Sequence, residues 1–485
     1  MTTRFKVVSD GDPFSNCHLE NQTFCRRLDS EQISFFEFLE AQGVLAELES
    51  LGLLTKVIIQ DQNYQETELV LEFPEVEQLL DWSLLCPSLR KDIALKILEI
   101  ELALGAFNLT LLNHSVKNFG LNKFGTPCLH NIFVIGIKKH HAFLYDEFFK
   151  YYFAPLILVD GRKELVSLIF KANNVSIVEF FSIRYPKTLK FINFLGQFGS
   201  FGKLINSLHN KLFIQSPIAA LIYTGNYLAF MKFALLRASK SLLNSRGTDS
   251  KFEIVLLRAM KAKINLLSFQ GIVQRWTSYH DKLDFDLLLR SELSDLSSNF
   301  GTRTETISKI LSKEQAGSLV DLGANNGFFS ILAARLGFSV VALDYDQGAI
   351  NRLYDWLKKT EHQLHIQPLT FDFVKFADGH NDHQNICGDV VLALGFLHHM
   401  RRVEFLKWEV IAKKLSEITG KLLVTEFKPD TAATSANELM AETIIKDYQL
   451  PCLLNALERH FSAVEVRGDR SMPGGGQRTL ILCKK

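Results

Sequence analysis

The stretch that most constrains the fold is Gly317–Asp346, in which two kinds of apolar pattern alternate. Ser318–Leu322 and Ser339–Leu343 are short apolar runs that predict buried strands. From Phe328 onward, apolar residues recur three and four apart, as on one face of a helix, and Gly337 is placed to end that helix. The order strand, glycine turn, helix and strand predicts one right-handed crossover of a parallel sheet.

The turn between strand and helix reads Asp321-Leu-Gly323-Ala-Asn325-Asn-Gly327. Its two glycines let the backbone turn tightly and approach a ligand, and the helix amino terminus beyond them can receive a phosphate or carboxylate. Asp344 ends the second predicted strand about twenty residues downstream, where nucleotide sites hold ribose hydroxyls. The pattern differs from the GxGxxG of NAD sites, and a tight turn without any ligand is the alternative interpretation.

The alternation of strands and helices continues to the carboxyl end. Further apolar runs predict strands at residues 365–371, 389–396, 421–427, 464–467 and 478–483. Apolar spacing from Val403 to Leu415 predicts a helix before the third of these. Residues 251–485 therefore predict an α/β fold, a doubly wound Rossmann-like sheet.

Polar residues cluster near the ends of these predicted strands. The acids there are Asp321, Asp344, Asp372 and Glu426, and open parallel sheets bind ligands at this edge. His398 and His399 follow the strand at 389–396, where a histidine of ordinary pKa can serve as general base. Capping the next helix or lining a pocket is the alternative role for the pair. A metal site from the histidines and Glu426 is not expected, because no further ligand is suggested.

The first half of the chain predicts a different, α+β and largely helical architecture. A length of 485 residues exceeds what one core can organise. The predicted regions are 1–160, a helical connecting region at 161–250, and 251–485, with Asn244–Ser250 as the best linker. Residues 76–112 predict continuous helix, and 129–137 predict a strand.

The segment that follows this helical stretch resembles the catalytic loop of a kinase, in which an Asp acts as base and an Asn holds a metal. Asn113 stands in place of the catalytic Asp, Asn118 matches the family's Asn, and Asn131 replaces the metal-binding Asp. A neutral amide can neither accept the hydroxyl proton nor balance magnesium, so phosphoryl transfer is not expected. Simple loops between core elements, or a kinase-like scaffold retained for binding, are the remaining alternatives.

Composition narrows the setting of the protein. A net charge of +1 gives no excess that would favour nucleic acid or an anionic membrane. The 7 cysteines are scattered without a C-x-x-C pair, which favours a reducing, cytoplasmic compartment over a disulfide framework. The amino terminus shows no apolar signal segment, and polar residues interrupt the most membrane-like stretch, Leu212–Leu236, so a buried or amphipathic helix pair is favoured there.

Short motifs in order resemble those of class I S-adenosylmethionine (SAM)-dependent methyltransferases, at residues 321–330, 343–346, 372–373, 392–399 and 425–427. They are similar to a bacterial two-part group that includes nodulation-protein-like members, in which the methyltransferase half follows a kinase-like region. The resemblance covers about residues 250–485 and, more faintly, 75–160, where this chain departs at Asn113 and Asn131. It implies SAM as cofactor and methyl transfer as the reaction.

The resemblance also implies which residues bind the cofactor, namely Asp321, Gly323, Asn325, Gly327, Asp344, Asp372, Phe373, Ala393 and Gly395. The two turn glycines would face the methionine moiety, and Asp344 would hold the ribose. Asp372 with Phe373 would hold the adenine, and the backbone from Ala393 would flank the sulfonium. Trp276 and Tyr279 lie ahead of the first motif and can pack on the cofactor, although simple packing is an equal alternative.

These observations predict a SAM-dependent methyltransferase with an unidentified acceptor. A small molecule or glycan hydroxyl is favoured by the nodulation-like resemblance alone, and His398 and His399 are the catalytic candidates. Protein or RNA methylation is one alternative, and the balanced charge argues against RNA. The other alternative is a SAM-binding protein that lacks turnover and serves as an interaction module.

Overall fold

The computed structural model describes residues 5–6, 17–20, 23–60, 69–138, 144–175, 179, 183, 250–277, 283–379, 386–429, 447–471 and 477–485. The chain forms two compact units, one of residues 1–122 and 126–272, the other of residues 123–125 and 273–485. Leu212–Leu236 and Tyr279 lie outside the described residues. Within the described ranges, no helix is both long and apolar enough to cross a membrane.

The first unit begins with antiparallel strands in the order β1–β2–β3–β5–β4. They are β1 (Phe5–Lys6), β2 (Cys17–Glu20), β3 (Thr23–Leu28), β4 (Ile58–Gln60) and β5 (Leu69–Phe73), with α1 (Ser30–Ala41) and α2 (Val44–Ser50) between β3 and β4. A capping box fixes the start of α1. The Asp29 carboxylate accepts from Gln32 N at 2.9 Å, and Gln32 Oε1 accepts from Asp29 N at 3.3 Å.

The prediction of one continuous helix over residues 76–112 is wrong. The stretch contains β6 (Gln78–Leu79), a 3₁₀ turn (Trp82–Leu84), α3 (Pro87–Leu104), a 3₁₀ turn (Gly105–Phe107) and β7 (Leu109–Leu111). Pro87 lies in the first turn of α3, where a residue without an N–H costs no helical hydrogen bond. Proline therefore separates the helix from the residues before it, which apolar spacing alone does not reveal.

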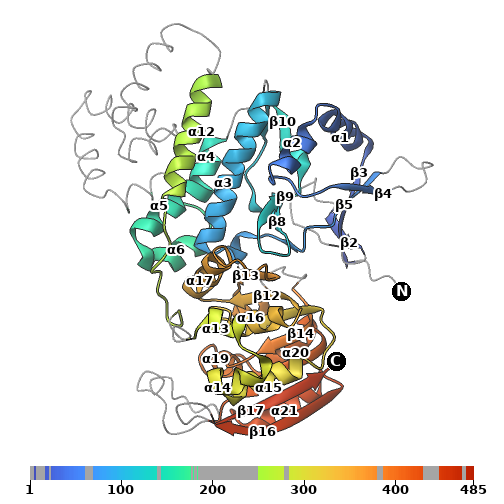
Figure 1. The fold of residues 1–485 in the computed structure, drawn as a ribbon, viewed down its shortest axis with the longest axis vertical. Helices are drawn as coiled ribbons and strands as arrows, with labels where there is room; N and C mark the ends of the chain where they lie inside the picture. Colours follow the sequence, from blue (N-terminus) through green and yellow to red (C-terminus); the bar gives the residue numbers. More distant parts are fainter. Residues whose placement is uncertain are drawn as a thin grey trace. The chain divides into compact units, whose positions relative to one another are not determined.

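Further strands and helices follow in the described part of this unit. They are β8 (Phe119–Leu121), β9 (Pro127–Leu129), β10 (Ile135–Ile137), α4 (Tyr145–Phe148), a π-helix (Phe149–Phe153), α5 (Ala154–Gly161), α6 (Val166–Lys171) and α12 (Ser250–Asn265). The strand predicted at 129–137 is thus divided, because a 3₁₀ turn at Ile132–Val134 interrupts it. Helix α12 lies beside α3 (Figure 1), and Lys91 Nζ donates to the carbonyls of Asn265 and Leu267.

The second unit is organised by a sheet, several of whose strands are labelled in Figure 1. Its strands run in the order β13–β12–β11–β14–β15–β17–β16. Their bounds are β11 (Ser318–Leu322), β12 (Ser339–Asp344), β13 (Ile366–Thr370), β14 (Gly388–Ala393), β15 (Thr419–Phe427), β16 (Ala463–Ser471) and β17 (Gln477–Lys484). The five neighbouring strands β13, β12, β11, β14 and β15 pair in parallel, and β17 runs antiparallel to both of its neighbours, β15 and β16. The chain moves outward from β11 to β13 and then returns to β14, so the order reverses between β11 and β14.

Helices cover both faces of this sheet. They are α13 (Phe285–Arg290), α14 (Leu296–Phe300), α15 (Thr302–Leu311), α16 (Phe328–Arg335), α17 (Gln347–Leu357), α18 (Phe373–Ala377), α19 (Leu397–Arg402), α20 (Trp408–Ile418) and α21 (Leu450–Glu458). Consecutive residues Leu319 and Val320 of β11, and Val390 and Val391 of β14, are all buried. Because side chains alternate across a strand, both faces must be covered. The predicted mixed α/β content is confirmed.

The helix predicted from Val403 to Leu415 begins only at Trp408. Helix α19 ends at Arg402 and α20 begins at Trp408. Between them Phe405 has a φ of +58°. A left-handed residue cannot continue a right-handed helix. Val403 and Leu406 therefore lie in the connection between α19 and α20, and their apolar spacing does not come from a helix.

Gly327 provides a test of the tight packing beneath the turn. Its φ is +85°, and an added Cβ would lie 2.5 Å from Leu353 Cδ2. We expect Gly327→Ala to lower the free energy of unfolding by about 2–5 kcal/mol, through left-handed strain and overpacking together. Gly379→Ala is the matched control, because its φ is +77° and no atom lies within 4 Å of the added Cβ. Equal losses for the two variants in urea unfolding would contradict the packing account.

Candidate functional site

Asp344, at the end of β12, accepts hydrogen bonds from two backbone N–H groups of neighbouring loops. Its Oδ2 lies 2.7 Å from Asn325 N, and its Oδ1 lies 2.8 Å from Asp346 N. Burial, which these donors offset only in part, raises the pKa of Asp344 to about 6. Each carboxylate oxygen retains acceptor capacity beyond one hydrogen bond, so a ligand carrying two neighbouring hydroxyls can still donate to it.

Asn325 occupies the centre of the turn after β11 in a left-handed conformation, with a φ of +53°. Its Nδ2 donates to the carbonyl of Trp276 at 2.6 Å. Its Oδ1 is buried and has no hydrogen-bond partner among the described residues. A buried acceptor without a donor is costly, so an N–H or O–H from a bound ligand would stabilise it. Asn325 is therefore an acceptor near the carboxyl end of β11.

Asp346 is a residue that the sequence analysis did not select. Its carboxylate caps α17 through Ala349 N at 2.9 Å. The same carboxylate accepts from Trp276 N at 2.9 Å and from Thr277 Oγ1 at 2.6 Å. Asp346 therefore holds the segment that contains Trp276 against the end of β12. An acid directly before a helical pattern is a known capping signal, but nothing in the sequence connects it to a residue 70 positions earlier.

Asp321 lies under the turn and not at the edge of the sheet. It is buried on β11, and its Oδ2 accepts from Ser330 Oγ of α16 at 2.6 Å. Burial is the main cause that raises the pKa of Asp321 to about 6, and the nearby Asp344 carboxylate adds to it. Its visible role is to connect the strand to the helix that follows the turn.

Aromatic side chains bring the ends of β11, β13 and β14 together. Phe396 lies next to Gly323, where an added Cβ would be 3.1 Å from Phe396 Cδ2. The Phe396 ring also meets the buried ring of Phe373 edge to face, with 5.1 Å between centroids. Asp372 caps α18, since its Oδ1 accepts from Val374 N at 3.1 Å. Gly323, Asp372 and Phe373 thus lie close together at the carboxyl ends of β11 and β13.

The end of β14 carries the other two predicted backbone positions. Ala393 is fully buried, and its carbonyl accepts from Thr425 Oγ1 at 3.0 Å. Gly395 follows with a φ of +68°, and an added Cβ there would lie 3.2 Å from Arg478 Nη1. A guanidinium group therefore lies directly against the backbone of Gly395.

His398 and His399 lie side by side in α19. Their ring centroids are 3.9 Å apart, and the His399 ring lies 4.7 Å from that of Trp276. Burial lowers the pKa of His399 to about 4, helped by the charges of Arg275, Lys428 and Arg478, and burial lowers the pKa of His398 well below its usual range. The expectation of an ordinary histidine pKa is wrong, because burial and the neighbouring cations lower both pKa values and make the two rings weak bases. No cluster of metal-ligating side chains exists among the described residues.

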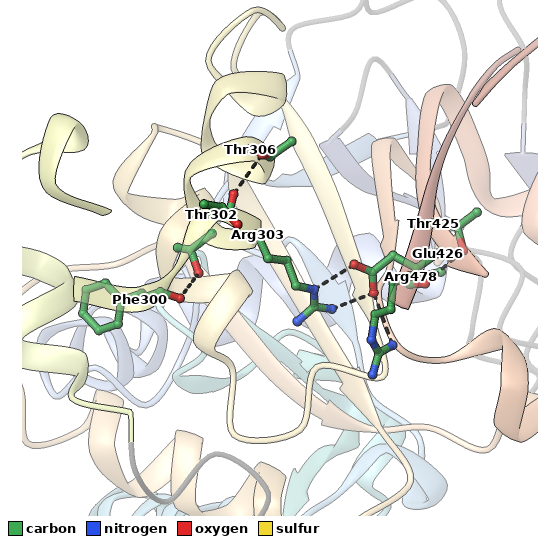
Figure 2. Close-up of polar contacts among 9 residues, drawn as sticks. Phe300, Thr302, Arg303, Thr306, Thr425, Glu426 and Arg478 are labelled. Carbon is green, nitrogen blue, oxygen red and sulfur yellow. Dashed lines mark hydrogen bonds and ion pairs between the residues drawn. The ribbon is translucent and has the colours of Figure 1, made fainter. Parts of the chain in front are cut away.

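Glu426, near the end of β15, is held by two arginines (Figure 2). Arg303 of α15 binds it bidentately, with Nε–Oε1 at 2.7 Å and Nη2–Oε2 at 2.8 Å. Arg478 Nη1 lies 3.4 Å from Oε2 of the same carboxylate. The acid expected at the ligand edge is therefore neutralised by ion pairing. Neither arginine was selected from the sequence, since nothing local marks a partner more than 50 residues away.

In the first unit, the three asparagines of the kinase-like pattern come together. Asn118 Nδ2 donates to Asn113 Oδ1 at 2.5 Å, and Asn131 Nδ2 donates to Asn118 Oδ1 at 2.9 Å. Arg26 Nη1, from β3, donates to Asn131 Oδ1 at 2.5 Å. The side chain that replaces the metal-binding Asp thus accepts from a guanidinium. Arg26 is another residue that sequence analysis missed.

Comparison with known proteins places these features in context. No family model matches the chain. It is 22% identical over 283 residues to nodulation protein NoeA of Rhizobium meliloti (strain 1021), a match that covers 55% of this chain and 57% of NoeA. This chain resembles nodulation protein NoeA. The similarity to NoeA confirms the nodulation-like resemblance seen in the motifs, and the chain spans less than two thirds of that relative.

Similar solved structures cover less of the chain. The EvdMO1 amino-terminal domain with S-adenosylhomocysteine (SAH) bound is 17% identical, covering 42% of this chain and 84% of that one, with a TM-score of 0.29. Magnesium protoporphyrin IX methyltransferase (ChlM) from Synechocystis PCC 6803, with bound SAH, is 13% identical, covering 43% and 96%, with a TM-score of 0.30. WbdD is 13% identical, covering 41% and 46%, with a TM-score of 0.29.

The buried Asp321 carboxyl predicts how stability changes with pH. A folded-state pKa raised from 3.8 to about 6 means that its stabilisation is present below about pH 4 and is lost as pH rises through about 6. We expect Asp321→Asn to raise the free energy of unfolding at pH 7.5 by on the order of 2 kcal/mol, and by clearly less at pH 4.5, where the folded-state carboxyl is mostly protonated. Urea unfolding at both pH values, with the exposed Asp286→Asn as control, checks this. A gain for Asp321→Asn that is the same at both pH values would contradict it.

Proposed function

We propose that the second unit is a class I SAM-dependent methyltransferase that transfers a methyl group to an acceptor. The observation that carries this proposal is the bond between Asn325, in the turn after β11 where the strand order reverses, and Asp344 at the end of the neighbouring β12. Open α/β sheets bind their ligands outside the carboxyl ends of the strands at such a point. The reversal between β11 and β14, with β17 inserted antiparallel, supports a Rossmann-like, doubly wound assignment for residues 273–485.

The residues near this edge fit the proposed cofactor. The Asp344 carboxylate has acceptor capacity for the ribose hydroxyls, and the orphaned Asn325 Oδ1 is a further acceptor. Phe373 supplies apolar surface for the adenine, with Asp372 beside it. The left-handed backbone of Gly323 and Gly327 shapes the turn that faces the methionine moiety. SAM, once bound, supplies a sulfonium methyl that is already activated for transfer.

His398 and His399 are the proposed residues at the acceptor. Both are neutral at pH 7, so they can accept a hydrogen bond or a proton from an acceptor hydroxyl. Their lowered pKa makes them weak bases, which limits proton abstraction to acidic acceptor groups. The Trp276 ring against His399 restricts how that ring can turn. Positioning of the acceptor is therefore their principal contribution.

The acceptor class is proposed from the similarity to NoeA alone, as a small molecule or a glycan hydroxyl. For the first unit, we propose a kinase-like scaffold retained for binding, since the amides of Asn113, Asn118 and Asn131 bond to each other and to Arg26. Residues 273–485 would then be the catalytic part, preceded by a recognition region.

Cofactor binding gives the first test of the proposed function. We expect SAH to bind the full chain, and Asp344→Ala to weaken that binding about a hundredfold or abolish it, because hydrogen bonds to a charged group are lost. Glu361→Ala removes an exposed acid and serves as the control. Isothermal titration calorimetry measures all three proteins. Equal SAH affinity in the Asp344→Ala variant would contradict the assignment.

The raised pKa of Asp344 gives a second test. Hydroxyl donors favour the ionised carboxylate, so we expect SAH affinity to be constant above about pH 7 and to fall as pH is lowered through about 6. Asp344→Asn, which has no proton to gain at that position, should lose most of this dependence. Calorimetric titrations between pH 5 and pH 8 compare the two proteins, and an unchanged slope in the variant would argue against a ribose contact by Asp344.

A further inference from the structure

Positive charge accumulates around the two histidines of the second unit. Arg303 already binds both oxygens of Glu426, and Arg478 reaches only Oε2 of that carboxylate, at 3.4 Å (Figure 2). Among the described residues, Glu426 is the one anionic group that Arg478 contacts. Two guanidinium groups therefore share one carboxylate, and the cluster keeps a net charge of +1.

Arg478 is placed where an acceptor is expected. Its Nη1 lies against the backbone of Gly395, three residues before His398. Its side chain is 12% exposed, so most of the guanidinium is shielded from water and its charge is weakly screened. The remaining N–H groups of its planar fork match the geometry of a carboxylate or phosphate.

Further cations act on the same place. The charges that influence His399 are those of Arg275, Lys428 and Arg478, all of them positive. Arg275 lies over the Trp276 ring, 5.0 Å from its centroid, and Trp276 in turn contacts His399. The loop after β15, the start of β17 and the segment before α13 thus contribute positive charge around one pair of neutral rings.

We infer that the methyl acceptor carries an anionic group, a carboxylate or a phosphate, which Arg478 binds beside His399. The inference rests on the proposed function, in which SAM is the cofactor. The sulfonium of SAM is itself a cation. A neutral acceptor would leave that cation among uncompensated positive charges in a weakly screened site, which is electrostatically unfavourable. An anionic acceptor offsets this charge.

Anion binding by the full chain tests the inference. Sodium phosphate and sodium acetate are titrated separately at pH 7.5 and constant ionic strength, with and without saturating SAH, and the thermal midpoint is followed. We expect the thermal midpoint of the wild type to rise saturably with at least one of the two anions. In Arg478→Gln, the affinity for that anion should be about tenfold weaker, whereas the affinity for SAH should change less than about twofold. Phosphate alone or acetate alone identifies which group the acceptor carries.

Matched variants make the outcome decisive. Arg467→Gln removes an exposed arginine that is paired with Glu465 on β16, and it should respond as the wild type does. If Arg478→Gln does not fold, the double variant Arg275→Gln/Lys428→Gln probes the same cationic neighbourhood and should weaken anion binding several-fold. No saturable rise in the wild type, or equal anion affinity in the variant that folds, would overturn the inference. Absence of SAH binding would instead contradict the proposed function, while the titration without SAH still reports on the anion site.

Discussion

The Asp344 carboxylate is the point on which the site of the second unit depends. It accepts one backbone N–H from the turn after β11 and one from the loop after β12, and so it fixes the two loops relative to each other. Asp346 extends this connection to Trp276 and Thr277. An ionisable group held by backbone donors in partial burial retains acceptor capacity, which is what recognition of a sugar diol requires.

Charge is distributed unevenly around this centre. Asp344 lies at the edge proposed for the cofactor, and Asp321 is buried under the neighbouring turn. Burial raises the pKa of each carboxyl to about 6. The side of His398 and His399 carries cations that outnumber Glu426. A cationic cofactor next to carboxylates and an anionic acceptor next to arginines would complement this arrangement. The proposed reaction therefore agrees with the electrostatics of both sides, whereas a neutral acceptor leaves one side unbalanced.

The sequence predicts the sheet of the second unit well, because its strands are buried on both faces and leave apolar runs bounded by turns. The strands at 318–322 and 339–343 are found within one residue of their predicted bounds. The prediction of one continuous helix over residues 76–112 is wrong because apolar spacing does not distinguish short buried strands from a helix. The predicted start of the helix over residues 403–415 is wrong because nothing in the sequence marks Phe405 as left-handed.

The site residues also divide into those that a local sequence pattern marks and those that it does not. Gly323, Asn325 and Asp344 could be selected because they belong to one local turn-and-strand pattern. Asp346, Arg303, Arg478 and Arg26 could not, since their roles come from partners that are distant in the sequence and meet only after folding. The depressed pKa values of His398 and His399 likewise arise from burial and from cations on other elements, which a single sequence does not reveal.

The most direct measurement is a crystal structure of the full chain grown with SAH. The account predicts SAH at the carboxyl ends of β11 and β12, with both ribose hydroxyls within hydrogen-bond distance of the Asp344 carboxylate and the adenine against Phe373. SAH bound at another edge of the sheet, or with its ribose away from Asp344, would contradict it.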